Sequence, residues 1–195
     1  PATVVGISAG VSYGALGSTH HSLHDMAALR AIHNITILVP ADNFEAREAI
    51  RAAAAAEHPM FVRFGKAAMY NLYNAGAKFE VGRAAALREG DDVAFIATGE
   101  TVVHCLLASA ALAEEGIDCR VVSMHTVKPL DVEAVLRAGR ECRAVVTAEE
   151  HSVPGGSAED PVTGAQADIF RHYGLSMEGL AKTATELLKH AEVSA

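Results

Sequence analysis

Residues 92–123 read DVAFIATGETVVHCLLASAALAEEGIDCRVVS, and the fold class follows from this stretch. Asp92–Thr98 and Asp118–Ser123 are short, mostly apolar runs of the length of a β-strand. Between them, Thr101–Glu115 has an apolar helical face and ends before Gly116, a residue typical of helix C-termini. A strand, a helix and a second strand in this order predict a βαβ unit in a parallel sheet that is covered on both faces.

The same alternation extends outward over the rest of the chain. Strands of four to seven residues separated by longer helices are typical of α/β proteins. Asp42 and Ser176 stand where they can cap two of the helices. The additional strands are expected at Thr3–Ile7, Ile35–Val39, Met60–Phe64 and Ala144–Ala148, and the additional helices at His20–Ile32, Asn43–Glu57, Asp131–Arg140 and Met177–Ala191.

The βα rhythm is interrupted once, near the middle of the chain. The segment MYNLYNAGAK (residues 69–78) contains two Tyr–Asn combinations and a glycine, and fits neither a strand nor a helix. We therefore divide the chain into a first α/β unit at residues 1–66, a linker at 67–78 and a second α/β unit at 79–195. A further loop is expected at Val153–Gly164, which is rich in Pro, Gly, Ser and Asp.

Composition excludes several classes of function. The chain has 195 residues, is 50% hydrophobic and 21% charged, and can therefore bury a core. A net charge of −8, only 5% aromatic residues and no Trp argue against nucleic-acid binding. The apolar runs are too short or too polar to span a membrane. Three scattered cysteines favour a reducing, cytoplasmic setting.

The first residue of the chain is Pro1 rather than Met, and it leads directly into an apolar run. We therefore expect the sequence to be a piece of a longer protein.

The first candidate for chemistry is the glycine-punctuated segment YGALGSTHHSLHD (residues 13–25). Loops that follow a parallel strand lie at the edge of the sheet where α/β proteins bind ligands. His20, at the start of the expected helix, can move protons or bind a sugar oxygen near neutral pH. Two other interpretations remain open: His20 and His24 form part of a metal site, or the histidines only cap the helix and face solvent.

Three other segments offer weaker candidates. Arg63-Phe64-Gly65-Lys66 follows a strand and suits a phosphate, although surface cations are common. Ala97–Thr101 lacks the GxGxxG pattern and indicates a structural turn. Glu149-Glu150-His151, followed by Gly155-Gly156, fits acid–base chemistry or, alternatively, a solvated rim or subunit contact.

Several short motifs occur in one order along almost the whole chain. They are Gly17-Ser18-Thr19-His20, Asp25 to Ile32, Pro40-Ala41-Asp42, Phe61 to Lys66, Val122 to Asp131 with its Lys128-Pro129-Leu130-Asp131, Thr147 to His151, and Tyr173 to Leu180. In this order they resemble the separately encoded C-terminal section of bacterial transketolases. The resemblance extends to 1-deoxyxylulose-5-phosphate synthases and, more distantly, to the β subunits of 2-oxoacid dehydrogenases.

The resemblance implies a fold, a reaction and partners. Residues 1–66 would be the C-terminal part of a three-layer, parallel-sheet pyrimidine-binding domain, and residues 79–195 a transketolase C-terminal domain. The enzyme would transfer a two-carbon ketol unit from a ketose to an aldehyde, and we expect the ketose to be phosphorylated. Thiamine diphosphate and Mg²⁺ would be bound mainly by other domains, and the partner would be an N-terminal transketolase section or a missing upstream segment. A homo-oligomer is also implied.

The resemblance assigns roles to individual residues. His20 matches the catalytic histidine of the Thr-His pair, which also contacts substrate oxygens. Lys66 stands where the family has a phosphate-binding Arg, and we include Arg63 and Ser8 in the substrate-binding set. Two positions depart from the family: Ser8 replaces a substrate-contacting His, and Leu16 replaces an acidic residue. We therefore expect an altered or narrower substrate.

The resemblance also identifies what this sequence lacks. No residue matches the glutamate that activates the coenzyme or the aromatic residues that stack on it. We therefore expect the chain alone to have no catalytic activity. The family has a further helix and strand between the positions of Ser157 and Asp160, so we suspect missing residues there.

The alternatives to a transketolase are a 1-deoxyxylulose-5-phosphate synthase, a 2-oxoacid dehydrogenase β subunit, and a degenerate scaffold that only dimerises.

Overall fold

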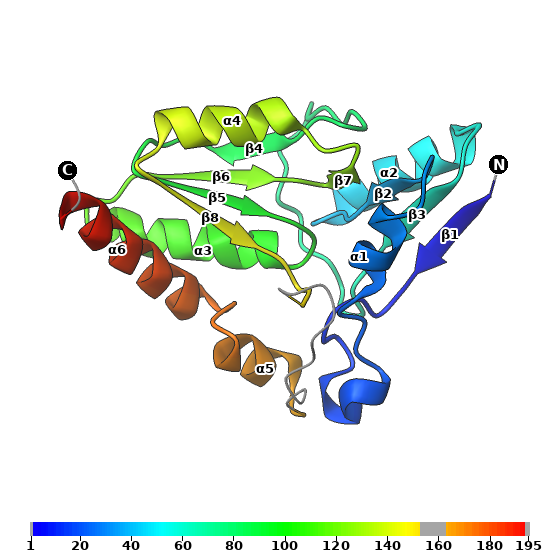
Figure 1. Ribbon diagram of the computed structural model, residues 1–195, viewed down its shortest axis with the longest axis horizontal. Helices are drawn as coiled ribbons and strands as arrows, with labels where there is room; N and C mark the ends of the chain where they lie inside the picture. The colour runs from blue at the N-terminus through cyan, green and yellow to red at the C-terminus, as the bar shows by residue number, and fades with distance from the viewer. Residues whose placement is uncertain (1, 153–162, 194–195) are drawn as a thin grey trace.

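The computed structural model describes residues 2–152 and 163–193 of the chain. This part of the chain contains two four-stranded sheets, with strand orders β1-β3-β2-β7 and β4-β6-β5-β8. The two sheets lie one after the other along the longest axis, with β1 at one end and the C-terminal part of α6 at the other (Figure 1).

The first sheet is built mainly from the first 66 residues. Strands β1, β3 and β2 run parallel, with β3 in the middle. The fourth strand, β7, comes from the second half of the chain and pairs antiparallel with β2. Helices α1 and α2 cover opposite faces of this sheet. The elements are β1 (Thr3–Gly6), α1 (Asp25–Arg30), β2 (Thr36–Leu38), α2 (Asn43–Ala55), β3 (Met60–Arg63) and β7 (Thr126–Lys128).

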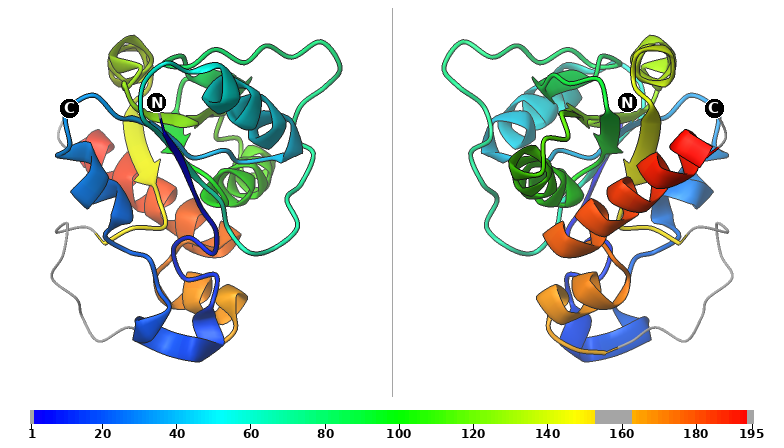
Figure 2. Two further views of the ribbon diagram at one scale, coloured as in Figure 1. Left: turned by 90° about the vertical axis from the view of Figure 1, so that its right-hand side faces the viewer. Right: turned by 90° about the vertical axis from the view of Figure 1, so that its left-hand side faces the viewer.

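The second sheet forms a three-layer domain. Strands β6, β5 and β8 run parallel, and β4 pairs antiparallel with β6 at the edge. Helices α3 and α6 cover one face and α4 covers the other (Figures 1 and 2). The elements are β4 (Ala85–Arg88), β5 (Val93–Ala97), α3 (Thr101–Glu114), β6 (Cys119–Ser123), α4 (Val132–Glu141), β8 (Ala144–Ala148), α5 (Gln166–His172) and α6 (Met177–Val193).

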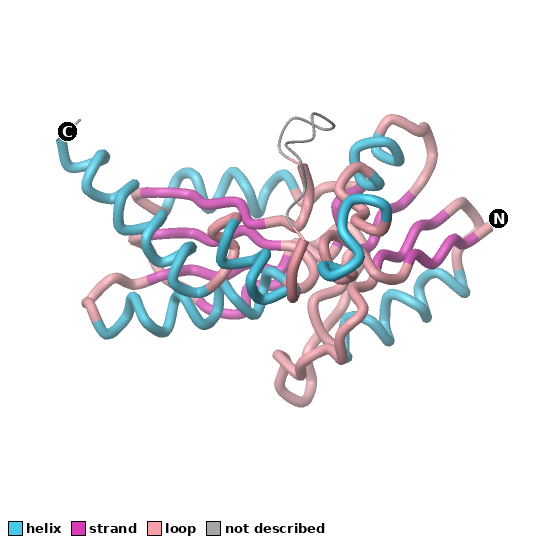
Figure 3. The backbone as a smooth tube through the Cα atoms, turned by 90° about the horizontal axis from the view of Figure 1, so that it is seen from below, coloured by secondary structure: helices cyan, strands magenta, loops and turns pink. Residues whose placement is uncertain are grey.

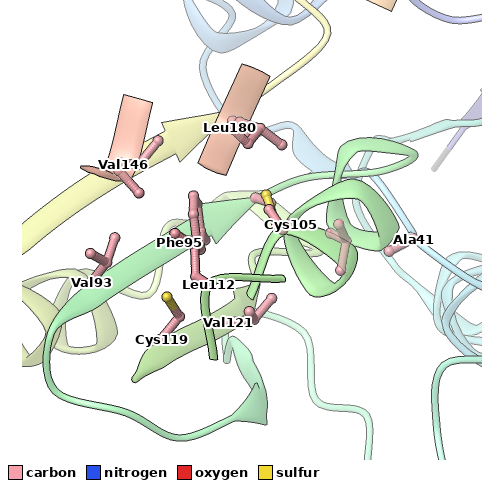
Figure 4. Close-up of a cluster of buried hydrophobic side chains, with 14 of the residues drawn as sticks. Ala41, Val93, Phe95, Cys105, Leu112, Cys119, Val121, Val146 and Leu180 are labelled. Carbon is pink, nitrogen blue, oxygen red and sulfur yellow. The ribbon is translucent and has the colours of Figure 1, made fainter. Parts of the chain in front are cut away.

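The larger core lies between this sheet and helices α3 and α6. Phe95 on β5 is fully buried and faces Leu112 of α3 and Leu180 of α6 (Figure 4). Cys105 and Cys119 belong to the same cluster and are free thiols. Burial raises the pKa of the Cys105 thiol to about 12, so this cysteine behaves as an apolar core residue.

Buried polar contacts fix the two sheets relative to each other. Glu45 of α2 has no solvent exposure, and its carboxyl accepts hydrogen bonds from the Ala41 N–H (2.7 Å) and from Ser123 Oγ at the end of β6 (2.7 Å). The Tyr73 hydroxyl, in the segment between the sheets, donates to the same carboxyl. Asp42 accepts from the Leu72 N–H at 2.9 Å. The carboxyl of Glu45 therefore joins α2, the connecting segment and the second sheet.

The expected α/β architecture is confirmed, and so are its local signals. The Asp42 side chain accepts from the Glu45 N–H and caps α2, and Ser176 Oγ accepts from the Gly179 N–H at the start of α6. Gly116, after α3, has a φ of +80°. Two strands of the described residues, β4 and β7, were not predicted, whereas a helix that ends before Gly174 was expected and is α5. The two strands are only four and three residues long, and their sheet pairing is antiparallel.

The helix predicted at His20–Ile32 is wrong in its first part. Residues Gly14–Thr19 form a 3₁₀ helix, η1, which contains Gly17 at a φ of +69°, and α1 begins only at Asp25. Ser22 lies between them in a bridge with Gly10, with N···O distances of 2.8 and 3.1 Å. Because this bridge uses the backbone of Ser22, the helix cannot extend back to His20, which follows η1 instead of starting a helix.

Part of the loop expected at Val153–Gly164 lies outside the described residues. The same holds for Gly155-Gly156 and for the suspected gap between Ser157 and Asp160. Over 2–152 and 163–193, no helix combines the length and apolar character that a membrane crossing requires. Figure 3 shows that the helices lie along the flanks of the two sheets and that loops meet where the sheets adjoin.

The core contact of Phe95 gives a stability prediction. Replacing Phe95 with Ala should lower the free energy of unfolding by about 3–5 kcal/mol, because it leaves a cavity between β5 and α3. Leu107→Ala, on the same helix α3 but 49% exposed, is the control and should cost less than about 1 kcal/mol. Urea denaturation followed by circular dichroism measures both; equal losses would contradict this description of the core.

Candidate functional site

A loop at the end of β1 carries two of the predicted site residues, Ser8 and His20. Ser8 follows the strand, is 7% exposed and has a φ of +66°. The next residue, Ala9, donates its N–H to the Phe64 carbonyl at 2.9 Å, and Phe64 follows β3. Because β1 and β3 are parallel neighbours, the loop after β1 and the segment that carries Lys66 begin at the same edge of the sheet.

Tyr13, His20 and Lys66 come together at this edge. The Lys66 ammonium lies 3.8 Å from the centroid of the Tyr13 ring, a cation–π contact. The ring of His20 meets the Tyr13 ring edge-on, with 5.7 Å between centroids. His20 and Lys66 are both exposed, so the imidazole is not sealed in the interior. We refer to these three residues as the Tyr13 cluster.

The Tyr13 cluster brings an imidazole and an ammonium to the same tyrosine ring. Thr19 Oγ1 lies 2.9 Å from Nδ1 of His20, which leaves Nε2 directed to other partners. A neutral imidazole can accept or donate a proton at that atom near neutral pH. The Lys66 ammonium, which Tyr13 positions, suits an anionic group such as a phosphate.

Arg63 is placed differently from the other predicted residues. Its side chain is 4% exposed, and its Nε forms a 2.7 Å ion pair with Asp25. Its Nη2 donates to the carbonyls of Ser22 (2.9 Å) and Glu150 (3.1 Å). Arg63 therefore links α1, the loop and the second domain, and it does not lie at the exposed surface of the Tyr13 cluster.

The two positions that depart from the expected pattern also differ in exposure. Ser8 is buried at the beginning of the loop, whereas Leu16 in η1 is 54% exposed. The Leu16 side chain offers no hydrogen-bond acceptor and adds apolar surface beside the loop.

The structure gives no support to a metal site at His20 and His24. His24 precedes α1, and its side chain makes no capping hydrogen bond. Over the described ranges, no group of three or more His, Cys, Asp and Glu side chains could hold a metal ion. These residues therefore do not fit a Mg²⁺ site.

The Glu149-Glu150-His151 segment divides between two environments. Glu149 is exposed, whereas Glu150 is 3% exposed and its Oε1 accepts from the Val11 N–H at 2.7 Å. Nε2 of His151 accepts from the Ala27 N–H at 3.3 Å. Burial, together with the charge of Glu100, raises the pKa of the Glu150 carboxyl to about 7, whereas the Val11 N–H and Arg63 act to lower it.

The structural interpretation of the Ala97–Thr101 turn is confirmed. Thr101 Oγ1 donates to the carbonyls of Thr98 and Ala148, at 2.8 Å each, and Gly99 has a φ of +55°. The neighbouring Glu100 has a second contact, because its carboxyl accepts from Nε2 of Gln166. Burial raises the pKa of Glu100.

A pocket of about 200 Å³ lies between the connecting segment and the second domain. His104 in its wall meets Phe170 edge-on, with 5.0 Å between ring centroids, and burial lowers the pKa of His104. The wall is mainly apolar, and its larger side chains are Met69, Tyr70, Glu100, His104, Gln166 and Phe170.

Two features of the site were not identified from the sequence. Tyr13 lies in the segment of residues 13–25 that carries His20. Its aromatic ring, seven positions before His20, was the sequence signal that could have indicated its place in the site. The contact of Glu150 with Val11 joins residues 139 positions apart, and a single sequence carries no signal for it.

Comparison with known proteins places the chain in a family. Residues 1–71 match the family model described as "Transketolase, pyrimidine binding domain". Residues 82–193 match the model "Transketolase, C-terminal domain". The chain belongs to the transketolase family, as its motif order indicated.

Individual relatives are similar over much of this chain. It is 40% identical to the B subunit of the apulose-4-phosphate transketolase of Phocaeicola vulgatus, over 95% of this chain and 67% of that protein. It is 39% identical to the SqwH subunit of the 6-deoxy-6-sulfo-D-fructose transketolase of a Clostridium species, over 78% of this chain and 48% of that protein. It is 34% identical to the 1-deoxy-D-xylulose-5-phosphate synthase of Symbiobacterium thermophilum, over 88% of this chain and 30% of that enzyme.

A solved structure shares the fold along nearly the whole chain. It is described as "Split gene transketolase, inactive beta4 tetramer", and matches with a TM-score of 0.81 and 30% identity. The match covers 96% of this chain and 66% of that one. The present chain thus spans about half to two thirds of the length of the transketolase subunits that it matches.

The raised pKa of Glu150 gives a prediction for stability against pH. Its folded-state pKa of about 7 lies above its ordinary value of 4.5, so the folded protein binds the additional proton between these values. The free energy of unfolding, relative to Glu150→Gln, should therefore fall as pH rises from 5 to 7, by about 1.4 kcal/mol per pH unit. Urea titrations of both proteins at pH 5, 6, 7 and 8 test this; a constant difference would contradict it.

Proposed function

We propose that this chain is the C-terminal portion of a two-part transketolase that moves a two-carbon ketol unit from a phosphorylated ketose to an aldehyde. The observation that carries the proposal is the exposed Tyr13 cluster at the carboxyl ends of β1 and β3. The similarity to subunits of two other transketolases supports it. We also propose that residues 1–66 and 79–195 are its two domains and 67–78 the linker.

The coenzyme of the proposed reaction is thiamine diphosphate, which when bound supplies the carbon nucleophile that cleaves the ketose. The buried acids Glu45 and Glu150 and the half-buried Glu100 each accept hydrogen bonds from this chain's own groups, so each is already engaged within the chain. We therefore propose that the coenzyme-activating acid comes from an upstream segment of the pyrimidine-binding domain, and that the Mg²⁺ ligands come from an N-terminal transketolase section.

The chain's own residues would bind and orient the sugar. Nε2 of His20 would hold or move a proton at a substrate oxygen, with Thr19 fixing the ring through Nδ1. Lys66 would bind the phosphate of the sugar, and Tyr13 would keep the ammonium in place. Ser8 and Leu16 would narrow the range of ketoses accepted, because neither supplies the group that the family pattern has there.

We further propose a cytoplasmic enzyme in which this chain is oligomeric together with its partner section. Sedimentation velocity of the mixed sections tests the assembly, and a mixture that sediments only as separate monomers would contradict it. Oxidation of a 2-oxoacid with a lipoamide acceptor, in place of ketol transfer, would overturn the assignment of the reaction.

The role of His20 is tested with a matched histidine. His20→Ala should lower kcat by about 10²- to 10⁴-fold in the complex with its partner section and thiamine diphosphate, because a proton-transfer group is lost. His24→Ala, four residues away and also exposed, is the control and should keep kcat within about twofold. Steady-state assays of ketose cleavage measure both, and an equal effect of the two substitutions would contradict the assignment.

The role of Lys66 is tested by comparing two substrates. Lys66→Gln should lower kcat/KM for a ketose phosphate by about 10- to 100-fold, since a charged hydrogen bond is lost, and should leave a ketose without phosphate little changed. Lys66→Arg keeps the charge and should retain most of the activity. Equal losses with both substrates would show that Lys66 does not recognise the phosphate.

A further inference from the structure

One residue of the second domain, Glu150, is connected to both ends of the loop that carries Tyr13 and His20, directly at one end and through Arg63 at the other. At the start of the loop, Oε1 of Glu150 accepts from the Val11 N–H at 2.7 Å. At the other end, the Glu150 carbonyl accepts from Nη2 of Arg63, which also donates to the Ser22 carbonyl. We call residues 11–22 the cluster loop.

The narrow base of the cluster loop is shaped around the Glu150 side chain. Gly10 and Ser22 close the base through two backbone hydrogen bonds of 2.8 and 3.1 Å. Gly10 has a φ of +58°, and a Cβ added there would lie 2.1 Å from Cδ of Glu150. Glycine at position 10 is therefore required both by its own backbone conformation and by the space that the Glu150 side chain occupies.

From these contacts we propose that Glu150 is a positioning residue, through which the C-terminal domain holds the cluster loop in place. The loop's position against β3 decides where Tyr13 and His20 lie relative to Lys66. The part of this inference that concerns substrate rests on the proposed function, whereas the anchoring itself does not. The second domain would thus contribute to the site without touching the sugar.

A carboxyl suits this position because the Val11 N–H is buried. A buried N–H without an acceptor is destabilising, so removal of the carboxyl should loosen the base of the loop. The groups that face Glu150 are Val11 of the cluster loop, Arg63 at the end of β3, Glu100 before α3 and Gln166 of α5. A glutamine has the same length and keeps a carbonyl oxygen as acceptor, so it should preserve the anchor.

Hydrogen–deuterium exchange on the full chain tests the anchoring directly. In Glu150→Ala, amides of the cluster loop should exchange at least about 10-fold faster than in the wild type, while those of β5 stay unchanged. Glu150→Gln should restore near wild-type protection. Glu149→Ala, at the exposed neighbouring position, is the control and should change neither region.

Each other result overturns the proposal. Unchanged loop exchange in Glu150→Ala would show that the contact holds nothing in place. Faster exchange in β5 as well would show that Glu150 affects the stability of the whole fold and does not hold the loop in particular. A glutamine variant as mobile as the alanine variant would exclude the acceptor role.

A kinetic measurement separates this inference from the proposed function. With the partner section and thiamine diphosphate present, Glu150→Ala should raise KM for a ketose phosphate by about 5- to 10-fold and Glu150→Gln by less than about twofold. Equal KM values for the wild type and Glu150→Ala would overturn the positioning role. If the exchange results are as expected but the wild type cleaves no ketose, the anchoring stands and the proposed function fails.

Discussion

The buried carboxyl of Glu45 is the contact on which the relative position of the two sheets depends. It lies in α2 of the first sheet and is held by Ser123 at the end of β6 and by Tyr73 between the sheets. The pKa of Glu45 is raised above its ordinary value, mainly because the carboxyl is buried, and the hydrogen bonds from Tyr73 and Ser123 offset part of this rise. A polar group without solvent exposure is tolerated only when its partners are in place, so the contact selects one docking of the domains.

The site at the surface follows from that docking. With the sheets fixed, the end of β8 reaches the loop after β1, and the N-terminus of α3 reaches the loop after β3. A glycine lies at both meeting points: a Cβ at Gly65 would lie 1.6 Å from an oxygen of Glu100, and one at Gly10, where φ is +58°, would overlap Glu150. The exposed imidazole and ammonium of the Tyr13 cluster are therefore carried by loops whose bases are packed against a second domain.

The sequence predicted those parts of the fold whose signals are local. β5 and β8 are apolar throughout or nearly so, and Asp42 and Gly116 mark helix ends through their own backbone chemistry. The predicted start of α1 was wrong because the bridge between Ser22 and Gly10, which lies twelve residues before Ser22, keeps the helix from starting earlier. For the site, His20 and Lys66 could be selected from their place after strands, whereas the inward orientation of Arg63 depends on Asp25 and Glu150, whose proximity only the folded chain creates.

The antiparallel pairing of β7 with β2 has a consequence for how the molecule comes apart. Ile37 pairs with Lys128 and Leu38 with Thr126, so a piece of the second half of the chain completes the first sheet. A protease cut between positions 67 and 78 would break the covalent connection and leave this shared strand in place. The two fragments should stay together after such a nick, and pulling them apart would expose the unpaired backbone of β2 along one side.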